Sequence, residues 1–221
     1  MADCFIIRRG NIQNESTLMP FRNGIVGYFD TTSVDISNNR WSNLLSGNHF
    51  VLPNGGTINN NALYLTSEQY GEFQMNNEPQ TFYCVFKVIT PSNDWNPIIS
   101  KMTTVESDYS ALCLSCNPSN AISTIVQGRE LVSSTLASEY HVVCISRNSN
   151  TVDFYIDGTS VGTIYANNGY YGGYCYLNRY YRNGFMHTPT DVEFKMCAIG
   201  DSYHSSSIVG GNTMFLLKKF L

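Results

Sequence analysis

Residues 140–165, YHVVCISRNSNTVDFYIDGTSVGTIY, decide the fold of this chain. Apolar residues recur with a period of two before the Asn-Ser-Asn turn and again after it, which is the spacing of a half-buried β-strand. Asp157-Gly158 then separates the second run from a third, and Asp-Gly is a strong signal for a two-residue hairpin because glycine accepts positive φ. The stretch therefore predicts a three-stranded antiparallel meander.

Side chains of the first run divide between two faces, because neighbours in a strand point in opposite directions. One face carries Val142, Cys144 and Ser146, and the other carries Val143, Ile145 and Arg147. We expect one of these faces to be apolar and the other to be mixed.

Short apolar runs with turn residues between them continue along the rest of the chain. No stretch keeps apolar residues at helical spacing for three turns, although 38–47 has the pattern of one short helical turn. Many short strands of this kind predict an all-β sandwich or barrel. We expect one domain over 23–221, with 1–22 as an N-terminal arm or first strand. The other predicted strands are 4–9, 24–30, 62–66, 81–89, 97–102, 110–116, 121–126, 192–200 and 213–221.

Composition excludes several classes of protein. Charged residues make up 14% of the 221 residues, well below the usual share of about 25%. Uncharged polar side chains must therefore form much of the surface that contacts water. The net charge of -4 argues against a nucleic-acid partner. No run approaches the roughly 18 apolar residues of a membrane span, so we expect no membrane insertion. The opening MADCFIIRRGN reverses the charge order of a signal peptide, and we expect no Sec-type export.

The seven cysteines are an odd number, so at least one is unpaired. Cys84, Cys144 and Cys197 lie inside apolar runs, where a free cysteine behaves as a small buried hydrophobe. Cys113 and Cys116 are three apart, which places them on opposite faces of a strand, and no second pair of ligands stands nearby to complete a zinc site. These cysteines indicate reduced thiols and folding in a reducing cytoplasm.

The meander also resembles the core of the laminin-G-like, concanavalin A-like lectin/glucanase superfamily. Flanking segments resemble other strands of that superfamily, so the resemblance covers 24–221. It implies an all-β, two-sheet antiparallel jelly-roll sandwich with a curved inner sheet, whose concave face and rim loops often bind sugar. The residues that match the central motif are His141, Val142, Arg147, Tyr155, Asp157, Gly158 and Gly162.

The first ten residues, MADCFIIRRG, resemble the start of small tail- or fibre-associated proteins of phages and prophages. This resemblance implies a virion component that is assembled in the cytoplasm of a bacterial host. Other virion subunits would then be its partners, and we expect a homo-oligomer.

Catalytic groups are not apparent. The glucanase branch uses a Glu-x-Asp-x-(x)-Glu stretch to supply two carboxylates, and Asp191-Val192-Glu193 is the nearest match, with Lys195 where a second Glu is needed. We interpret this stretch as an edge of polar surface. No Gly-x-Ser-x-Gly elbow accompanies the four histidines, and His141 has the position of a structural strand residue that packs or bonds locally. We therefore expect no enzymatic activity.

Oxygen-rich loops leave a calcium site open, because Ca²⁺ needs six to eight oxygen ligands. Such residues are more often plain turn formers, so we expect no metal and no cofactor. The residues concerned are Asn93, Asp94, Asn96, Asp108 and Asp201.

Sugar binding needs an aromatic face for the C–H side of a pyranose and polar groups for its hydroxyls. Trp95 stands among Asn93, Asp94 and Asn96 in a loop and is a candidate for that role, whereas Trp41 lies next to apolar residues and is predicted to fill core.

A tyrosine-rich stretch over 165–185 gives further candidates. Its middle alternates, with Tyr174 and Tyr176 on one face and Cys175 and Leu177 on the other, and we interpret it as a core strand with one of these two rows buried. At its ends, pairs of tyrosines stand among Gly, Asn and Arg in predicted turns. This residue composition is typical of recognition loops. Core packing and contact with a neighbouring subunit remain open for these pairs. They are Tyr170 with Tyr171, and Tyr180 with Tyr181.

The leading hypothesis is a non-enzymatic binding or adhesion module of a phage or prophage virion (tail, fibre or head decoration) that recognises host surface glycan. A structural virion protein that binds only other subunits is the alternative, because a fold does not determine a function. A glycoside hydrolase is less favoured, because the pair of carboxylates is missing.

Overall fold

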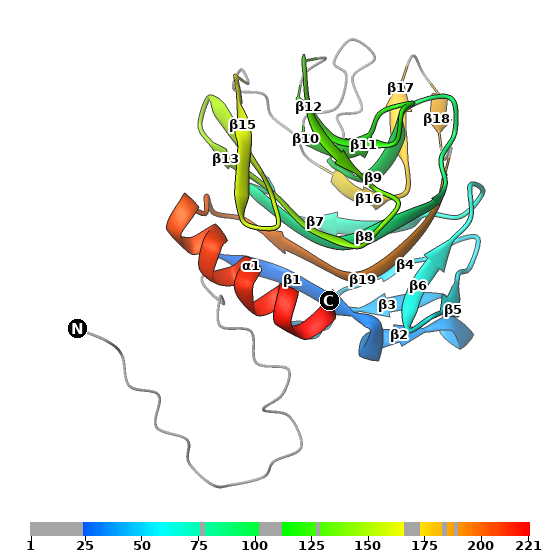
Figure 1. The fold of residues 1–221 in the computed structure, drawn as a ribbon. Helices are drawn as coiled ribbons and strands as arrows, with labels where there is room; N and C mark the ends of the chain where they lie inside the picture. The colour runs from blue at the N-terminus through cyan, green and yellow to red at the C-terminus, as the bar shows by residue number, and fades with distance from the viewer. Residues whose placement is uncertain are drawn as a thin grey trace, which may run out of the picture.

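The computed structural model describes residues 24–75, 78–101, 112–126, 129–165, 173–182, 185–187 and 190–221. Two antiparallel sheets face each other, and a helix covers the outer face of one of them (Figure 1). The predicted all-β two-sheet sandwich is therefore confirmed. The arm and the strand predicted over 4–9 lie outside the described residues.

The first sheet, sheet A, has eight strands. Its centre is β8, which pairs with β13 on one side and with β19 on the other, and β1 (Ile25–Asp30) also pairs with β19. In order the path runs β15 (Thr159–Tyr165), β14 (Thr151–Ile156), β13 (His141–Asn148), β8 (Thr81–Thr90), β19 (Asp191–Gly200), β6 (Ala62–Leu65) and β5 (Thr57–Asn59).

The second sheet, sheet B, has nine strands. In order these are β12 (Arg129–Leu136), β11 (Ala121–Val126), β10 (Leu112–Cys116), β9 (Asn96–Lys101), β16 (Gly173–Leu177), β7 (Gly71–Met75), β4 (His49–Val51), β3 (Arg40–Ser42) and β2 (Val34–Asp35). A separate hairpin joins β17 (Tyr180–Arg182) to β18 (Phe185–His187), and two short 3-10 turns, η2 (Thr31–Ser33) and η3 (Ile36–Asn38), flank β2.

The predicted meander is present as β13, β14 and β15. Asp157 and Gly158 adopt φ values of 49° and 80°, the left-handed pair that a two-residue hairpin of this hand requires. His141 bonds locally as predicted, because its Nδ1 lies 2.7 Å from Asp157 Oδ2. The same carboxylate accepts the backbone N–H of Val142 at 2.8 Å, so one side chain ties the turn to the start of the meander.

The chain end over 213–221 is not a strand, contrary to the prediction, but part of the helix α1 (Ser206–Phe220). Its buried side chains are Val209, Asn212, Thr213 and Leu216, which follow the spacing of one helix face. Two of the four are polar, and this is why apolar periodicity did not reveal a helix. None of the described helices combines the length and the hydrophobicity that a membrane crossing requires.

Helix α1 covers the outer face of β13. Its residues Val209 and Leu216 pack into a second hydrophobic cluster on the outer side of sheet A, together with Val142 and Cys144. On the other side of the strand, Val143 and Ile145 belong to the main core. Ser146 and Arg147 are buried as well, so β13 has two covered faces.

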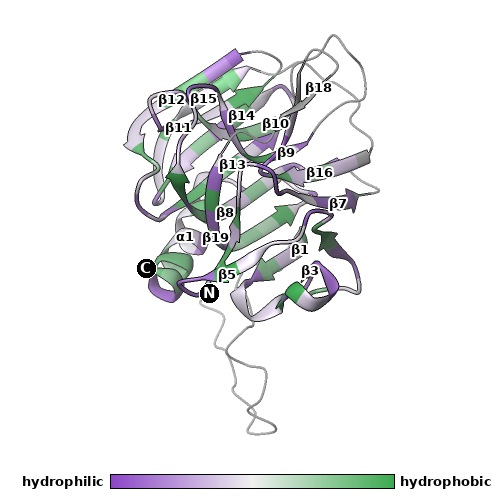
Figure 2. Ribbon diagram, turned by 90° about the vertical axis from the view of Figure 1, so that its right-hand side faces the viewer, coloured by the Kyte–Doolittle hydropathy of each residue, from purple (hydrophilic) through white to green (hydrophobic). Residues whose placement is uncertain are grey.

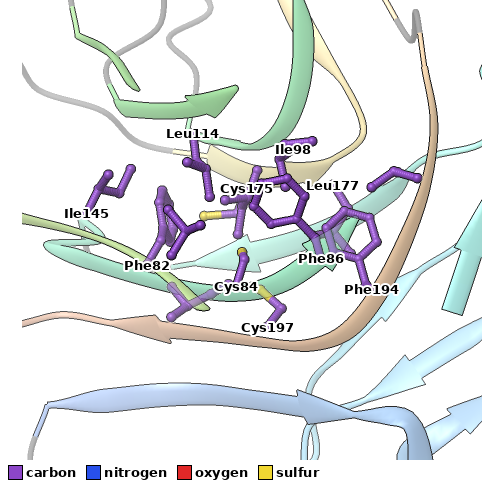
Figure 3. Packing of buried hydrophobic residues seen from close by; sticks show 14 of the residues in the cluster. Phe82, Cys84, Phe86, Ile98, Leu114, Ile145, Cys175, Leu177, Phe194 and Cys197 are labelled. Atoms are coloured by element: carbon purple, nitrogen blue, oxygen red, sulfur yellow. The ribbon is translucent and has the colours of Figure 1, made fainter. Parts of the chain in front are cut away.

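The main core lies between the sheets and includes thiols from both of them (Figure 3). Cys84 and Cys197 are direct neighbours across β8 and β19, and Cys175 approaches from sheet B. All six described cysteines are free and buried, which confirms the prediction for Cys84, Cys144 and Cys197.

Hydrophobic and hydrophilic positions alternate along several strands, as the period of two requires (Figure 2).

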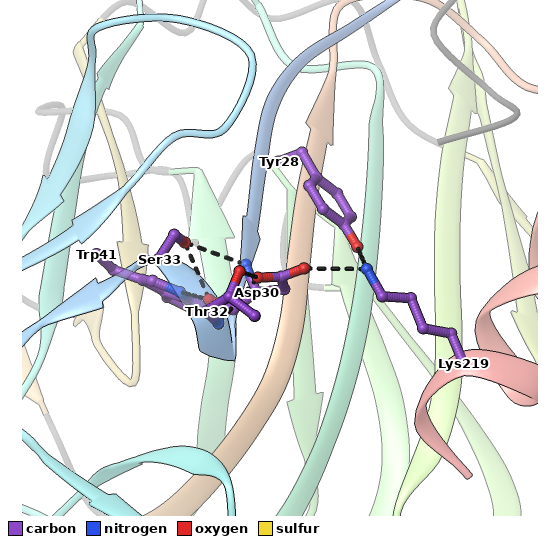
Figure 4. A network of polar contacts seen from close by, with 6 residues as sticks. All are labelled: Tyr28, Asp30, Thr32, Ser33, Trp41 and Lys219. Carbon is purple, nitrogen blue, oxygen red and sulfur yellow. Dashed lines mark hydrogen bonds and ion pairs between the residues drawn. The ribbon is translucent and has the colours of Figure 1, made fainter. Parts of the chain in front are cut away.

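Trp41 fills core, as predicted, and is fully buried. The helical turn predicted over 38–47 is replaced by β3, because pairing with β4 carries the indole into the space between the sheets. Its Nε1 donates to the carbonyl of Asp30 at 2.7 Å (Figure 4). The Asp30 carboxylate also accepts from Lys219 Nζ at 3.0 Å, so the end of α1 is tied to β1.

Glycines in the middle of α1 allow a direct test of helix stability. Gly210 and Gly211 lie inside the helix, and a Cβ added at either position meets no atom within 4 Å. We expect Gly210→Ala and Gly211→Ala to raise the free energy of unfolding by about 0.5–1 kcal/mol each, because alanine restricts the unfolded chain and favours helix. Urea unfolding measures this change. Gly158→Ala, at positive φ, is the matched control and must destabilise; equal effects at all three positions would contradict the assignment of the helix.

Candidate functional site

Sheet B contains a pocket at the place where strands β4 and β7 separate from each other. Among the described residues the ladder between them has one pair, Val51 opposite Glu72. A pocket of about 600 Å³ occupies the space beyond this pair. Its described lining is Val26, Gly47, Asn48, His49, Val51, Glu72, Phe73, Gln74, Met75 and Tyr174.

Two tyrosines of β16 stand beside the pocket on the outer face of sheet B. Tyr174 lies opposite Gln74 and Tyr176 opposite Glu72 on the neighbouring strand β7. Because Cys175 and Leu177 fill the core, the tyrosines must point the other way. Tyr174 is 42% exposed, and its ring centroid lies 6.1 Å from that of Tyr176 with an angle of 36° between the planes. The two rings are neighbours on this face, and Tyr174 also lines the pocket.

Arg179 closes the other end of this surface. Its guanidinium carbon lies 3.8 Å from the centroid of the Tyr70 ring and 5.9 Å from that of Tyr176. Its Nη1 is 3.4 Å from Glu72 Oε1, which gives an ion pair between partly covered side chains. We call Tyr70, Arg179, Tyr176 and Tyr174 the tyrosine row.

The loop after β16 holds Arg179 in place. Asn178 is fully buried with φ of 51°. Its Nδ2 donates to the carbonyls of Thr66, Gln69 and Thr190 at 2.9, 3.0 and 2.9 Å. The hydroxyl of Ser100 donates to the Arg179 carbonyl at 2.6 Å. The row is therefore built on a rigid backbone, which lowers the entropic cost of binding.

Burial raises the pKa of the Tyr176 hydroxyl, and the negative charge of Glu72 raises it further. This hydroxyl therefore stays protonated and can donate a hydrogen bond. Of the described residues that line the pocket, Glu72 is the one carboxylate, and neither lysine nor arginine is among them. Asn48 and Gln74 contribute exposed amides, so the site offers neutral donors and acceptors beside an aromatic surface.

The loop predicted around Trp95 lies at the far end of the row. Ile99 of β9 is opposite Leu177 of β16, so the start of β9 lies toward Arg179 and away from the pocket. Trp95 is half-buried, while Asn93 and Asp94 are exposed.

Asn96, another candidate in that loop, is fully buried. Its Oδ1 accepts from the backbone N–H and the hydroxyl of Ser92 at 3.0 and 2.8 Å, which holds the turn together.

The tyrosine-rich stretch has a different arrangement from the one expected. Tyr170 and Tyr171 lie outside the described residues, as does the side chain of Tyr181, and Tyr180 is buried. The middle is core for Cys175 and Leu177, as predicted, but its tyrosines face outward. Alternation in the sequence separated the two faces correctly, and no local signal showed which of them the second sheet covers.

Glu193 corrects the interpretation of 191–193 as polar surface, because its side chain is 1% exposed. It accepts from Tyr140 at 2.6 Å and from Asn59 at 2.8 Å, and Lys87 lies 3.5 Å away. These partners compensate the burial of a carboxylate. Asp191 accepts the backbone N–H of Ser67 at 2.7 Å.

Potential metal ligands do not gather in the part of the chain that the structure describes: no three His, Cys, Asp or Glu side chains there could share an ion. His204 is buried, and its Nδ1 lies 2.9 Å from the hydroxyl of Tyr83.

No protein-family model and no curated protein sequence matches this chain. Solved structures do match in three dimensions. Trypanosoma rangeli sialidase superposes with a TM-score of 0.68 at 14% identity, over 90% of this chain and 33% of the sialidase. The same sialidase in complex with sialic acid gives 0.72 at 14% identity over the same shares. The receptor binding domain of botulinum neurotoxin C/D mosaic serotype gives 0.66 at 11% identity, over 87% of this chain and 51% of that one.

These matches show the fold. The chain spans about a third of the sialidase and about half of the toxin domain. Its fold is a two-sheet β-sandwich, which confirms at that level the architecture expected from the sequence. At such identities a shared fold does not transfer a site or an activity.

Proposed function

We propose that this chain is a non-enzymatic carbohydrate-binding module and that the tyrosine row with its adjacent pocket is the binding site. The observation that carries the proposal is the outward face of Tyr174, beside an open pocket whose described lining includes exposed amides. An aromatic ring stacks on the apolar face of a pyranose, and amides and hydroxyls bond its hydroxyl groups. A protein-binding face is expected to be larger and to carry more apolar area at its centre.

Glycan cleavage is the second reading, since the matched sialidases are enzymes. Most glycoside hydrolases use two carboxylates about 5–10 Å apart across the scissile bond, and sialidases differ in using a tyrosine as the nucleophile. In the described lining Glu72 stands alone, and Arg179 already pairs with it. Glu193 is buried among its own partners on sheet A, a different sheet from the row. The arrangement favours binding over cleavage.

The finer proposal is an adhesion module of a phage or prophage virion that presents the row to host surface carbohydrate, in an oligomer with other virion subunits. It rests on the resemblance of residues 1–10 and on the lectin-like fold. A structural virion protein that binds only other subunits is its alternative.

A glycan array tests the binding site. We expect the folded parent to bind at least one class of glycan, and Tyr174→Ala to weaken that binding at least tenfold, which corresponds to about 1.4 kcal/mol. Tyr165→Ala is the matched control, because Tyr165 is 69% exposed on β15 of sheet A. Each variant is compared with the parent by thermal unfolding.

Two outcomes would contradict this proposal. Binding that survives Tyr174→Ala and disappears in Trp95→Ala would move the site to the loop before β9. A well-folded parent that binds no glycan would favour the structural alternative.

A further inference from the structure

We infer that the ligand is an uncharged glycan of at least two sugar rings, which lies along Tyr176 and Tyr174 and ends in the pocket between β4 and β7. This inference rests on the proposed function and adds the charge, the length and the direction of the ligand.

The charge follows from the described groups around the site. A bound anion needs a cation or a cluster of free N–H donors, and the described lining has neither lysine nor arginine. Arg179, the nearest cation of the row, is already engaged by Glu72 and by two aromatic rings. Glu72 lines the pocket and compensates the charge of Arg179, so the described groups offer no net positive charge to a carboxylate, sulfate or phosphate. The site therefore disfavours acidic glycans.

The length follows from the two rings of β16. Tyr174 and Tyr176 are separate stacking surfaces, since their centroids are 6.1 Å apart and their planes differ by 36°. Tyr70 does not extend the surface, because the Arg179 guanidinium lies over its ring at 3.8 Å. Two sugar rings therefore fit on the row itself, one on each tyrosine.

The direction follows from the asymmetry of the two ends. At the Tyr70 end the ion pair of Arg179 with Glu72 closes the row. At the Tyr174 end the row opens into about 600 Å³ lined by Asn48, His49 and Gln74. Amides offer both donors and acceptors, which suits sugar hydroxyls that do both. A chain that stacks on the tyrosines thus has its end unit in the pocket.

The experiment uses the full chain and pairs each neutral glycan of an array with its sialylated, sulfated or uronic-acid counterpart. Oligosaccharides of one to six units are then prepared from the neutral glycan that binds most strongly. The affinity of the protein for each of them is measured by titration calorimetry. We expect acidic counterparts to bind at least tenfold more weakly, and affinity to rise at least tenfold between one and two units. Tyr176→Ala is expected to remove most of that second gain.

Gln74→Lys provides the gain-of-function control, because it places an ammonium at an exposed position in the pocket. We expect it to bind acidic counterparts at least fivefold more tightly than the parent does. Glu72→Gln should shift the preference in the same direction, because it leaves the charge of Arg179 uncompensated.

The outcomes separate this inference from the proposed function. A preference for acidic glycans that still depends on Tyr174 would overturn the inference and leave the carbohydrate-binding site in place. A single sugar unit that binds as tightly as the longer series would overturn the predicted length. A folded parent protein that binds no glycan would overturn both the inference and the proposed function.

Discussion

Stability should fall steeply above pH 9, because the core holds thiols that must stay protonated in the folded chain. Burial raises the pKa of Cys113 and of Cys175 to about 12. Burial also raises the pKa of Cys116, Cys144 and Cys197. In the unfolded chain a thiol ionises near pH 8.5–9, so these five groups titrate in different pH ranges before and after unfolding.

The sign of the effect follows from proton release. Between about pH 9 and pH 12 the unfolded chain loses protons that the folded chain keeps, and alkali therefore favours unfolding. Each thiol lowers the free energy of unfolding by about 1.4 kcal/mol per pH unit in this window, so five thiols lower it by about 7 kcal/mol at pH 10. That loss is comparable to the whole stability of a typical domain, about 5–15 kcal/mol. Below pH 8 the contribution of the thiols is complete.

Urea unfolding at pH 8, 9 and 10 in the presence of a reductant measures this loss. Cys113→Ala is the informative variant, because it removes one of the five titrating groups. The free energy of unfolding of this variant should fall between pH 8 and pH 10 by about 1.4 kcal/mol less than that of the parent, whatever the substitution costs at pH 7. Stability that stays constant from pH 8 to pH 10 in the parent would show that these thiols are open to solvent.

Replacing Trp41 with alanine should lower the free energy of unfolding by about 3–5 kcal/mol, the usual range for removing a large aromatic side chain from a core. The indole is fully buried and packs against Phe29, Phe50 and Phe194 at centroid distances of 5.7, 6.2 and 6.2 Å. Its Nε1 also satisfies the carbonyl of Asp30, which the variant leaves without that donor.

Trp95→Ala is the matched control for Trp41→Ala, since these are the two tryptophans of the chain. Trp95 is half-buried in a loop, and its removal should cost about 1 kcal/mol or less. Far-UV circular dichroism during urea unfolding reports both variants without relying on tryptophan fluorescence. Equal losses in the two variants would mean that Trp41 does not hold β3 against the core.

Strands with a clear period of two were predicted well, because burial of one face imposes that period on the residues themselves. The Asp157-Gly158 turn was predicted for a similar reason, since the left-handed conformation selects glycine. Helix α1 was missed because Asn212 and Thr213 occupy buried positions on its inner face. Asn212 fits there because the outer side of sheet A supplies a polar partner, the Tyr83 hydroxyl, 3.0 Å from its Nδ2.

The candidate site was only partly accessible from the sequence. Tyr174 and Tyr176 were placed on one face of a strand and one face was expected to be buried, which is correct, but the sequence did not show which face it is. Both faces carry bulky side chains, so composition does not distinguish them. Contacts between residues far apart in the chain make the distinction, as in the pairing of Tyr176 with Glu72 and the stacking of Arg179 on Tyr70.

Local rules were enough to determine the fold class, the central meander, the buried thiols and the core position of Trp41, because each depends on neighbours within one strand or one turn. The tertiary structure decided which face of β16 is open, where β4 leaves β7 to form the pocket, and why Glu193 is buried. These features depend on partners that are distant in sequence, such as Lys87, which lies more than a hundred residues from Glu193. Hydrophobic burial constrains pattern, and long-range packing alone determines which surface remains for a ligand.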